Sequence, residues 1–147
     1  ERFPRLKTMI VEGGTMFMLP SWLRLMDFHY TEGQISAKLG NFRAHLSLKP
    51  SEYFKRNIGI GASCVLRPDL DMRHEVGLES VMWGSDFPHP EGSWPNTAQY
   101  LKDNFGDFPE QDGRQILGEN AIKFYGLDRQ RLQAIADEIG PTAALFN

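Results

Sequence analysis

The sequence lacks the features that would place it in a specialised class of proteins. Its 147 residues include no apolar run of the roughly eighteen residues that cross a bilayer, and no short apolar segment with a basic front that would direct secretion. Sixteen basic residues are interspersed with nineteen acidic ones, so there is no basic stripe to neutralise phosphate groups. We therefore expect a cytoplasmic protein that binds neither membranes nor nucleic acid.

Cysteine and histidine are also scarce. The single cysteine, Cys64, excludes an internal disulfide and any zinc site built from several cysteines. Its residue type, within an apolar run, predicts a small buried hydrophobe rather than a reactive thiol. His29, His45 and His74 form no His-x-His or His-Glu-x-x-His pattern, so the chain holds no complete set of metal ligands by itself.

Short apolar runs alternate with segments of helical period. Residues 7–11, 58–65 and 80–84 predict three buried strands, because each run is short, apolar and bounded by turn residues. Helices are predicted over residues 20–30, within 46–57 from Ser51 onward, and over 69–76, 96–105, 110–127 and 128–140. Strands that alternate with helices predict parallel βα units, and hence an α/β fold.

Individual residues predict where the helices begin and end. Glycines are expected to end three of them and to split a fourth, whereas Ser51 and Asp128 are expected to begin helices as N-caps. The expected helix ends are Gly33, Gly77 and Gly126, and the expected break is Gly118.

Three strands are too few for a free-standing α/β domain, because a three-stranded parallel sheet leaves both edges open. The sequence also opens at Glu1, without a methionine, on a stretch that reads as a loop before a strand. We therefore expect the sequence to begin part-way through a longer protein.

Two carboxylates follow predicted strands, at the end where α/β proteins gather their reactive groups. Glu12 follows "TMIV" and Asp86 follows "VMWGS". A carboxylate there is costly unless it is hydrogen-bonded, paired or bound to a cation. Asp86 is either a functional group or the cap of a turn, and Glu12 is either functional, an ion-pair partner, or a cap on the Gly13–Gly14 backbone.

The loop after the third strand adds a histidine and an indole. His89 lies between Pro88 and Pro90, three residues beyond Asp86, and could donate a hydrogen bond or carry a proton. Its alternative is an ordinary surface side chain. Trp83, inside the strand, should be core, whereas Trp94 either walls a pocket or covers the end of the sheet.

At this point the motifs resemble a known family. "GSDFPHPEGSWPNT", followed by "ILGENAIKFYGL", resembles the carboxyl-terminal end of the amidohydrolase-2 family, the metal-dependent barrel hydrolases and decarboxylases related to aminocarboxymuconate-semialdehyde decarboxylase. "FPRLKTMIVEGGTMFMLPSWLRLMD" resembles that family's sixth strand and following helix, and "KPSEYFKRNI" the approach to its seventh. The resemblance implies that residues 1–147 are strands six to eight and the C-terminal helices of a (β/α)8 TIM barrel.

The resemblance also implies a metal site at the mouth of the barrel. The family builds it from a His-x-His pair after the first strand, a His after the fifth, and an Asp after the eighth, which Asp86 matches. The implied cofactor is a divalent metal, zinc or manganese, in the full-length protein, or none in this chain alone. Asp86 would bind metal and carry a proton, with Glu12 as an acid/base or outer group and His89 as a hydrogen-bond partner.

The implied activity is that of a hydrolase acting on a small carboxylated or aromatic substrate, with Phe17, Phe87 and Trp94 as contacts for a planar ring. One alternative is a decarboxylase, a carbon–carbon lyase. Its members carry His in "HGG" where this chain has Glu12 in "EGG", and a negative charge disfavours an adjacent anionic intermediate. The other alternative is a non-catalytic fragment whose open sheet edges assemble it into a homo-oligomer.

Overall fold

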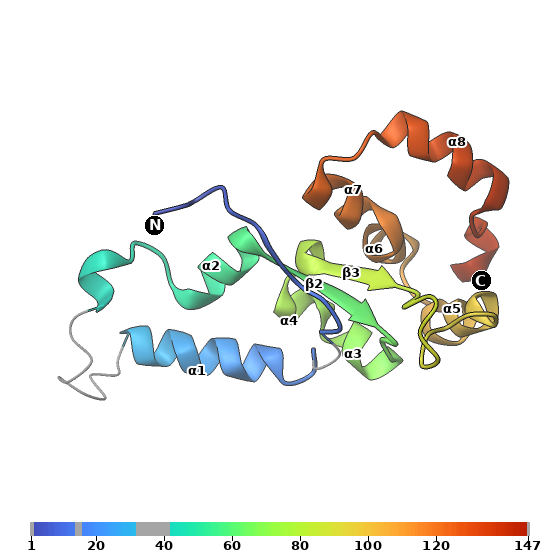
Figure 1. The fold of residues 1–147 in the computed structure, drawn as a ribbon. Coiled ribbons are helices and arrows are strands. Elements are labelled where there is room, and N and C mark those ends of the chain that lie inside the picture. The colour runs from blue at the N-terminus through green and yellow to red at the C-terminus, as the bar shows by residue number, and fades with distance from the viewer. Residues whose placement is uncertain (1, 14–15, 32–41, 147) are drawn as a thin grey trace.

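Three parallel strands form a single sheet in the computed structural model, which describes residues 2–13, 16–31 and 42–146 (Figure 1). The strands are β1 (Thr8–Ile10), β2 (Ile58–Ser63) and β3 (Val81–Gly84), in that order across the sheet. Thr8 pairs with Ile58, and Ser63 pairs with Gly84. The three predicted strands and the α/β class are confirmed, and β2 is the middle strand.

Helices follow each strand, as the sequence predicts. Figure 1 shows α1 running beneath the sheet, while α7 and the turn before it pack against β3. None of the helices in the described ranges is long and apolar enough to cross a membrane. The α-helices are α1 (Leu19–Thr31), α2 (Pro50–Asn57), α3 (Arg67–Asp71), α4 (Arg73–Val76), α5 (Thr97–Phe105), α6 (Glu110–Arg114), α7 (Asn120–Tyr125) and α8 (Arg129–Ile139).

The core lies around β2 and β3 rather than around β1. Ile60, Ala62 and Val81 are fully buried in the two strands, as expected where helices cover both faces of a parallel sheet. They pack with Phe105 of α5 and Ile116, which precedes α7. In β1 the outer residues Thr8 and Ile10 are exposed, so this edge of the sheet is the least covered.

The predicted N-cap of α2 is wrong, whereas that of α8 is confirmed. Pro50 occupies the first turn of α2, where its missing N–H costs nothing, and Lys49 becomes the N-cap. Ser51 makes a tertiary contact instead, because its backbone N–H and Oγ donate to the carboxylate of Asp27 at 2.9 and 2.6 Å. Asp128 caps α8 by accepting the Arg131 N–H at 3.1 Å.

The predicted break at Gly118 is also wrong. The chain stays helical through a π-helical turn at Gln115–Glu119, which joins α6 to α7 by accommodating an extra residue in one turn. Gly126 ends α7 in the left-handed conformation, φ 65°, as predicted. Gly77 ends α4 as predicted, although the expected single helix there is two short ones. The expected end at Gly33 lies outside the described residues.

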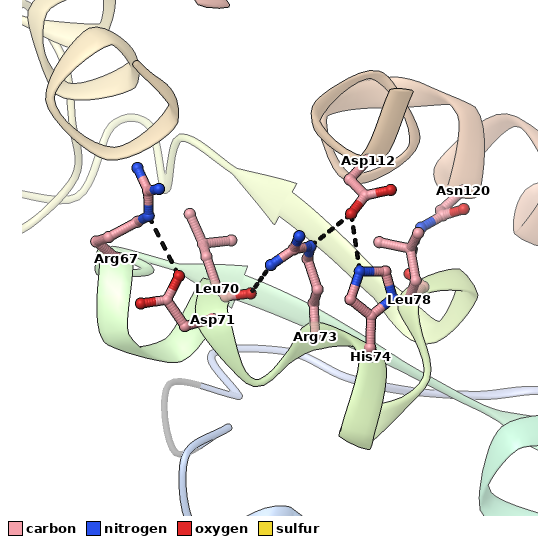
Figure 2. A network of polar contacts seen from close by, with 8 residues as sticks. All are labelled: Arg67, Leu70, Asp71, Arg73, His74, Leu78, Asp112 and Asn120. Carbon is pink, nitrogen blue, oxygen red and sulfur yellow. Dashed lines mark hydrogen bonds and ion pairs between the residues drawn. The ribbon is translucent and has the colours of Figure 1, made fainter. Parts of the chain in front are cut away.

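A polar network ties α4 to α6 (Figure 2). Asp112 Oδ2 lies 2.7 Å from Arg73 Nε and 2.9 Å from His74 Nε2. The Arg73 guanidinium also lies 4.3 Å from the centre of the Phe108 ring. Because the side chains of Arg73 and Asp112 are only 12% and 15% exposed, this pair is shielded from solvent. It fixes the position of α6 against α4.

Asn120, in the "LGENA" motif, holds α7 against the start of β3. Its buried side-chain amide donates to the carbonyl oxygens of Leu78 and Val81 at 2.7 and 2.8 Å. Both carbonyls flank the entry of the chain into β3. The motif therefore fixes the strand whose far end leads to Asp86.

Candidate active site

A left-handed backbone marks the carboxyl end of all three strands. Glu12 follows β1 closely, Cys64 directly follows β2, and Asp86 lies two residues beyond β3, with φ values of 57°, 52° and 60°. Of the other described non-glycine residues, only Asp107 has a positive φ. Residues other than glycine rarely adopt this backbone conformation, and such strained residues cluster at functional sites. This end of the sheet is therefore the candidate site.

Asp86 and His89 are brought together here. His89 Nδ1 lies 3.3 Å from Asp86 Oδ2, and the His89 backbone N–H donates to the Asp86 carbonyl at 2.8 Å. The Asp86 side chain is 23% exposed, so its carboxylate is reachable from solvent. The Glu91 N–H also lies 3.4 Å from His89 Nδ1. Both contacts are made to Nδ1, so this nitrogen faces the Asp86 carboxylate when it carries a proton and accepts from the Glu91 N–H when it does not.

The loop that carries these residues is closed on itself. Gly92 N–H donates to the His89 carbonyl at 2.9 Å, and Ser93 N–H donates to the Ser85 carbonyl at 3.0 Å. A Cβ on Gly92 would come within 2.7 Å of the Ser85 oxygen and 3.0 Å of the Asp86 oxygen. Only glycine fits at this position, and the compact loop holds Asp86 in a fixed place.

Phe87 and Trp94 form an aromatic pair on the same loop. Their ring centroids are 5.6 Å apart in an edge-to-face arrangement, and both side chains are mostly exposed. Trp94 therefore covers the loop rather than the end of the sheet. Trp83 packs against the core as predicted but is only half-buried, and its indole Nε1 has no hydrogen-bond partner among the described residues.

Glu12 and Phe17 are not brought to Asp86. β1 stops opposite Ile60, whereas β2 and β3 continue to Ser63 and Gly84. Two strand spacings separate the edge strands, so the Glu12 and Asp86 backbones are about 10 Å apart or more. Glu12 is exposed and makes no ion pair with any described residue. Phe17 is exposed too, and its backbone N–H lies 3.3 Å from Asp69 Oδ1.

The prediction that Cys64 is a buried hydrophobe is wrong. β2 ends at Ser63, two residues earlier than the apolar run suggests, so Cys64 emerges exposed at the carboxyl end of the sheet. Its Sγ donates to the Glu91 carbonyl at 2.9 Å. Partial desolvation of the sulfur, together with the negative charges of Asp86 and Glu91, raises the pKa of the Cys64 thiol. The thiol therefore remains protonated and able to donate.

Tyr100 is a further residue that sequence reasoning missed. From α5 its hydroxyl donates to the Val65 carbonyl, directly after Cys64. Burial, followed by the nearby charges of Cys64 and Asp69, raises the pKa of Tyr100 to about 12. The neutral phenol thus anchors the chain just beyond β2. No local pattern distinguishes this tyrosine from an ordinary helix residue, because its partner is 35 residues away.

The family follows from the sequence comparison. The sequence model of the amidohydrolase-2 family, described as amidohydrolase, matches residues 1–127, which include every strand and all helices up to α7. The chain belongs to this family. Its motifs predicted that membership. The search of curated proteins found no match.

The fold is similar to part of a solved member of the amidohydrolase-2 group. The crystal structure of 5-carboxyvanillate decarboxylase from Sphingomonas paucimobilis matches with a TM-score of 0.62 and 30% sequence identity. The match covers 86% of this chain and 36% of that chain, so this chain spans about a third of its relative's length. The predicted partial TIM barrel is confirmed, while the assignment of residues 1–147 to strands six to eight stays a prediction.

Amidohydrolase-2 members are generally metal-dependent, so their sites must provide enough ligands for a divalent ion. Such an ion takes at least three protein ligands in most enzyme sites. Within the described ranges no group of three His, Cys, Asp or Glu side chains is placed to hold one. Asp86 fits one ligand position, because its carboxylate is a hard oxygen donor at the carboxyl end of a strand. The described residues therefore do not by themselves complete a set of ligands.

Proposed function

We propose that this chain supplies part of the active site of a metal-dependent amidohydrolase-2 enzyme, with Asp86 as metal ligand and proton carrier. The observation that supports this most directly is the left-handed Asp86 at the end of β3, 3.3 Å from His89 on a loop closed on itself. A divalent metal, zinc or manganese, would supply Lewis-acid charge when bound. His89 would orient the Asp86 carboxylate through Nδ1.

The proposed substrate is small and carboxylated or aromatic. The Phe87–Trp94 pair offers an exposed apolar surface directly beside Asp86, and edge-to-face rings pack well against a further planar ring. Phe17, in the turn before α1, remains a second candidate contact. The relative's substrate, a carboxylated vanillate by its name, fits this description.

The proposed reaction is decarboxylation. The bond between a ring carbon and its carboxylate breaks, carbon dioxide leaves, and the ring carbon takes a proton that Asp86 in its protonated form would supply. The similarity to a decarboxylase at 30% identity supports this reaction. Glu12, which stands where decarboxylase members carry histidine, is the feature that favours the other candidate reaction.

Hydrolysis is the second candidate, favoured by Glu12 itself. Where decarboxylase members carry histidine, this chain carries a carboxylate that can accept a proton from water. In that reaction Asp86 or Glu12 would take the proton of the attacking water. Both reactions use the same fold, so the product identifies the reaction.

The test is a product assay on the full-length protein supplied with zinc or manganese. Release of carbon dioxide from aromatic carboxylates, abolished in Asp86→Asn, is the expected result. Glu79→Gln, which removes an exposed carboxylate before the other end of β3, should retain wild-type turnover. Cleavage of amides or esters without carbon dioxide would assign hydrolysis instead. Wild-type turnover in Asp86→Asn would contradict the proposed role of Asp86.

A further inference from the structure

The Asp86 loop, residues 85–96, meets the rest of the chain at few points. It leaves β3 at Gly84 and enters α5 at Thr97, where Ser93 Oγ lies 3.1 Å from the Thr97 hydroxyl. Midway along the loop, the Glu91 carbonyl oxygen accepts a hydrogen bond from the Cys64 thiol, with the two heavy atoms 2.9 Å apart. This bond crosses from the end of the middle strand to the centre of the loop.

The donor in this contact is held from two sides. Ser63 pairs with Gly84, so Cys64 leaves the sheet level with Ser85 at the start of the loop. On the other side of Cys64, the Tyr100 hydroxyl fixes the Val65 carbonyl to α5. The thiol is therefore a fixed point against which the loop can be placed.

The acceptor is coupled to Asp86 by close packing. Glu91 is followed by Gly92, whose Cα lies so close to the Ser85 and Asp86 carbonyls that a Cβ would meet them at 2.7 and 3.0 Å. A shift of the Glu91 carbonyl therefore moves the turn that begins at Asp86. The Glu91 carbonyl is in this way coupled to the Asp86 backbone, from which the carboxylate projects.

We propose that Cys64 is a positioning residue, whose thiol sets the place of the Asp86 loop over the carboxyl end of the sheet. This proposal rests on the proposed function, because the position of the loop matters to turnover only if Asp86 acts in the reaction. Cys64 itself touches no reacting group in this account.

The experiment compares Cys64→Ala, which removes the donor, with Cys64→Ser, which keeps one, in the full-length enzyme. A sulfhydryl is a weak donor, so we expect Cys64→Ala to lower kcat/KM about two- to fivefold, mainly through kcat, and Cys64→Ser to recover most of the loss. The matched control is Gln99→Ala, which removes an exposed hydrogen bond to Asp103 on α5 and should leave kcat/KM unchanged.

A second measurement is independent of turnover. Hydrogen exchange of the backbone amides of His89, Glu91, Gly92 and Ser93 should become faster in Cys64→Ala and return toward the wild-type rate in Cys64→Ser. Unchanged exchange and unchanged kcat/KM in Cys64→Ala would overturn the proposal, as would a Cys64→Ser variant impaired as much as Cys64→Ala.

The two proposals fail in different ways. Faster exchange in Cys64→Ala together with wild-type turnover in Asp86→Asn would support the positioning of the loop by Cys64 and contradict the catalytic role of Asp86. Loss of turnover in Asp86→Asn together with wild-type kcat/KM and hydrogen exchange in Cys64→Ala would support the proposed function and contradict the positioning role of Cys64.

Discussion

At the scale of single residues, the site depends on backbone conformation as much as on side-chain type. Glu12, Cys64 and Asp86 each leave their strand through a left-handed residue, which re-aims the chain at the carboxyl end of the sheet. Asp86 then gains His89 as a neighbour three residues on. From the sequence, Asp86 could equally be a turn cap or a functional group, and in the structure the His89 imidazole lies beside it.

His89 provides the first prediction. His89→Ala removes the Nδ1 atom that lies 3.3 Å from Asp86 Oδ2, so the carboxylate loses its orienting contact. We expect kcat/KM to fall by up to about fivefold, because a solvent-exposed pair of this kind contributes roughly 0.2–1 kcal/mol. His89→Asn, whose amide nitrogen can occupy the place of Nδ1, should retain more activity. Equal activity in His89→Ala and the wild type would show that the imidazole is an ordinary surface group.

Gly92 provides the second prediction. Gly92→Ala would press a methyl group against three carbonyl oxygens, those of Ser85, Asp86 and His89, all within 3.0 Å. We expect a loss of about 1–3 kcal/mol in the free energy of unfolding, measured by chemical denaturation, because backbone atoms cannot yield easily. Gly118→Ala is the control, since nothing lies within 4 Å of its added Cβ. Equal stability of the two variants would contradict the close packing of the loop.

At the scale of elements, the helical segment after the Asp86 loop is attached both to α4 and to the start of β3. The Arg73–Asp112 pair attaches α6 to α4, and Asn120 attaches α7 to the residues that begin β3. From the sequence alone, the "LGENA" motif is only a signature of the family. The structure gives it a physical role, because the amide of Asn120 satisfies two buried carbonyls at once.

The third prediction concerns Asn120. Asn120→Ala would leave the Leu78 and Val81 carbonyls without their donor in a buried place, and we expect a loss of about 2–3 kcal/mol in unfolding free energy. Gln133→Ala, which removes an exposed hydrogen bond on α8, should change stability by less than about 0.5 kcal/mol. Similar values for the two variants in urea titrations would argue against the anchoring role.

The fourth prediction concerns Asp112. Asp112→Asn weakens a pair in which both side chains are shielded, and leaves the Arg73 guanidinium without its counter-charge. We expect a loss of about 2–4 kcal/mol in unfolding free energy. Glu110→Gln breaks the exposed pair with Arg114 on α6 and should cost less than about 1 kcal/mol. Thermal unfolding of both variants is the check, and an order reversed between them would refute the role of burial.

At the scale of the whole molecule, the sheet is similar to part of a larger fold in the solved relative. The solved decarboxylase is nearly three times as long as the matched segment, and in a closed barrel no strand has an open edge. Here β1 is an edge, and large exposed apolar side chains gather on β1 and α1. They include Leu6, Ile10, Val11, Trp22, Leu25 and Met26. The homo-oligomer and the cytoplasmic location stay predictions.

Sequence patterns located the strands, most helices and the Asp86–His89 pair, because these depend on local periodicity and on residues close in sequence. They missed Cys64, since the end of β2 is set by pairing with β3 and not by the length of the apolar run. They missed Tyr100 because its contact spans 35 residues. Glu12 follows β1, and strand order places β1 and β3 at opposite edges of the sheet, which the sequence alone does not show.

The central claim is that Asp86 binds the metal of the full-length enzyme. The most direct measurement is elemental analysis of the purified wild-type protein and of Asp86→Asn, both confirmed to be folded by circular dichroism. We predict about one equivalent of zinc or manganese per active site in the wild type and a loss of most of it in the variant. Equal metal content in the two proteins would contradict the assignment of Asp86 as a ligand.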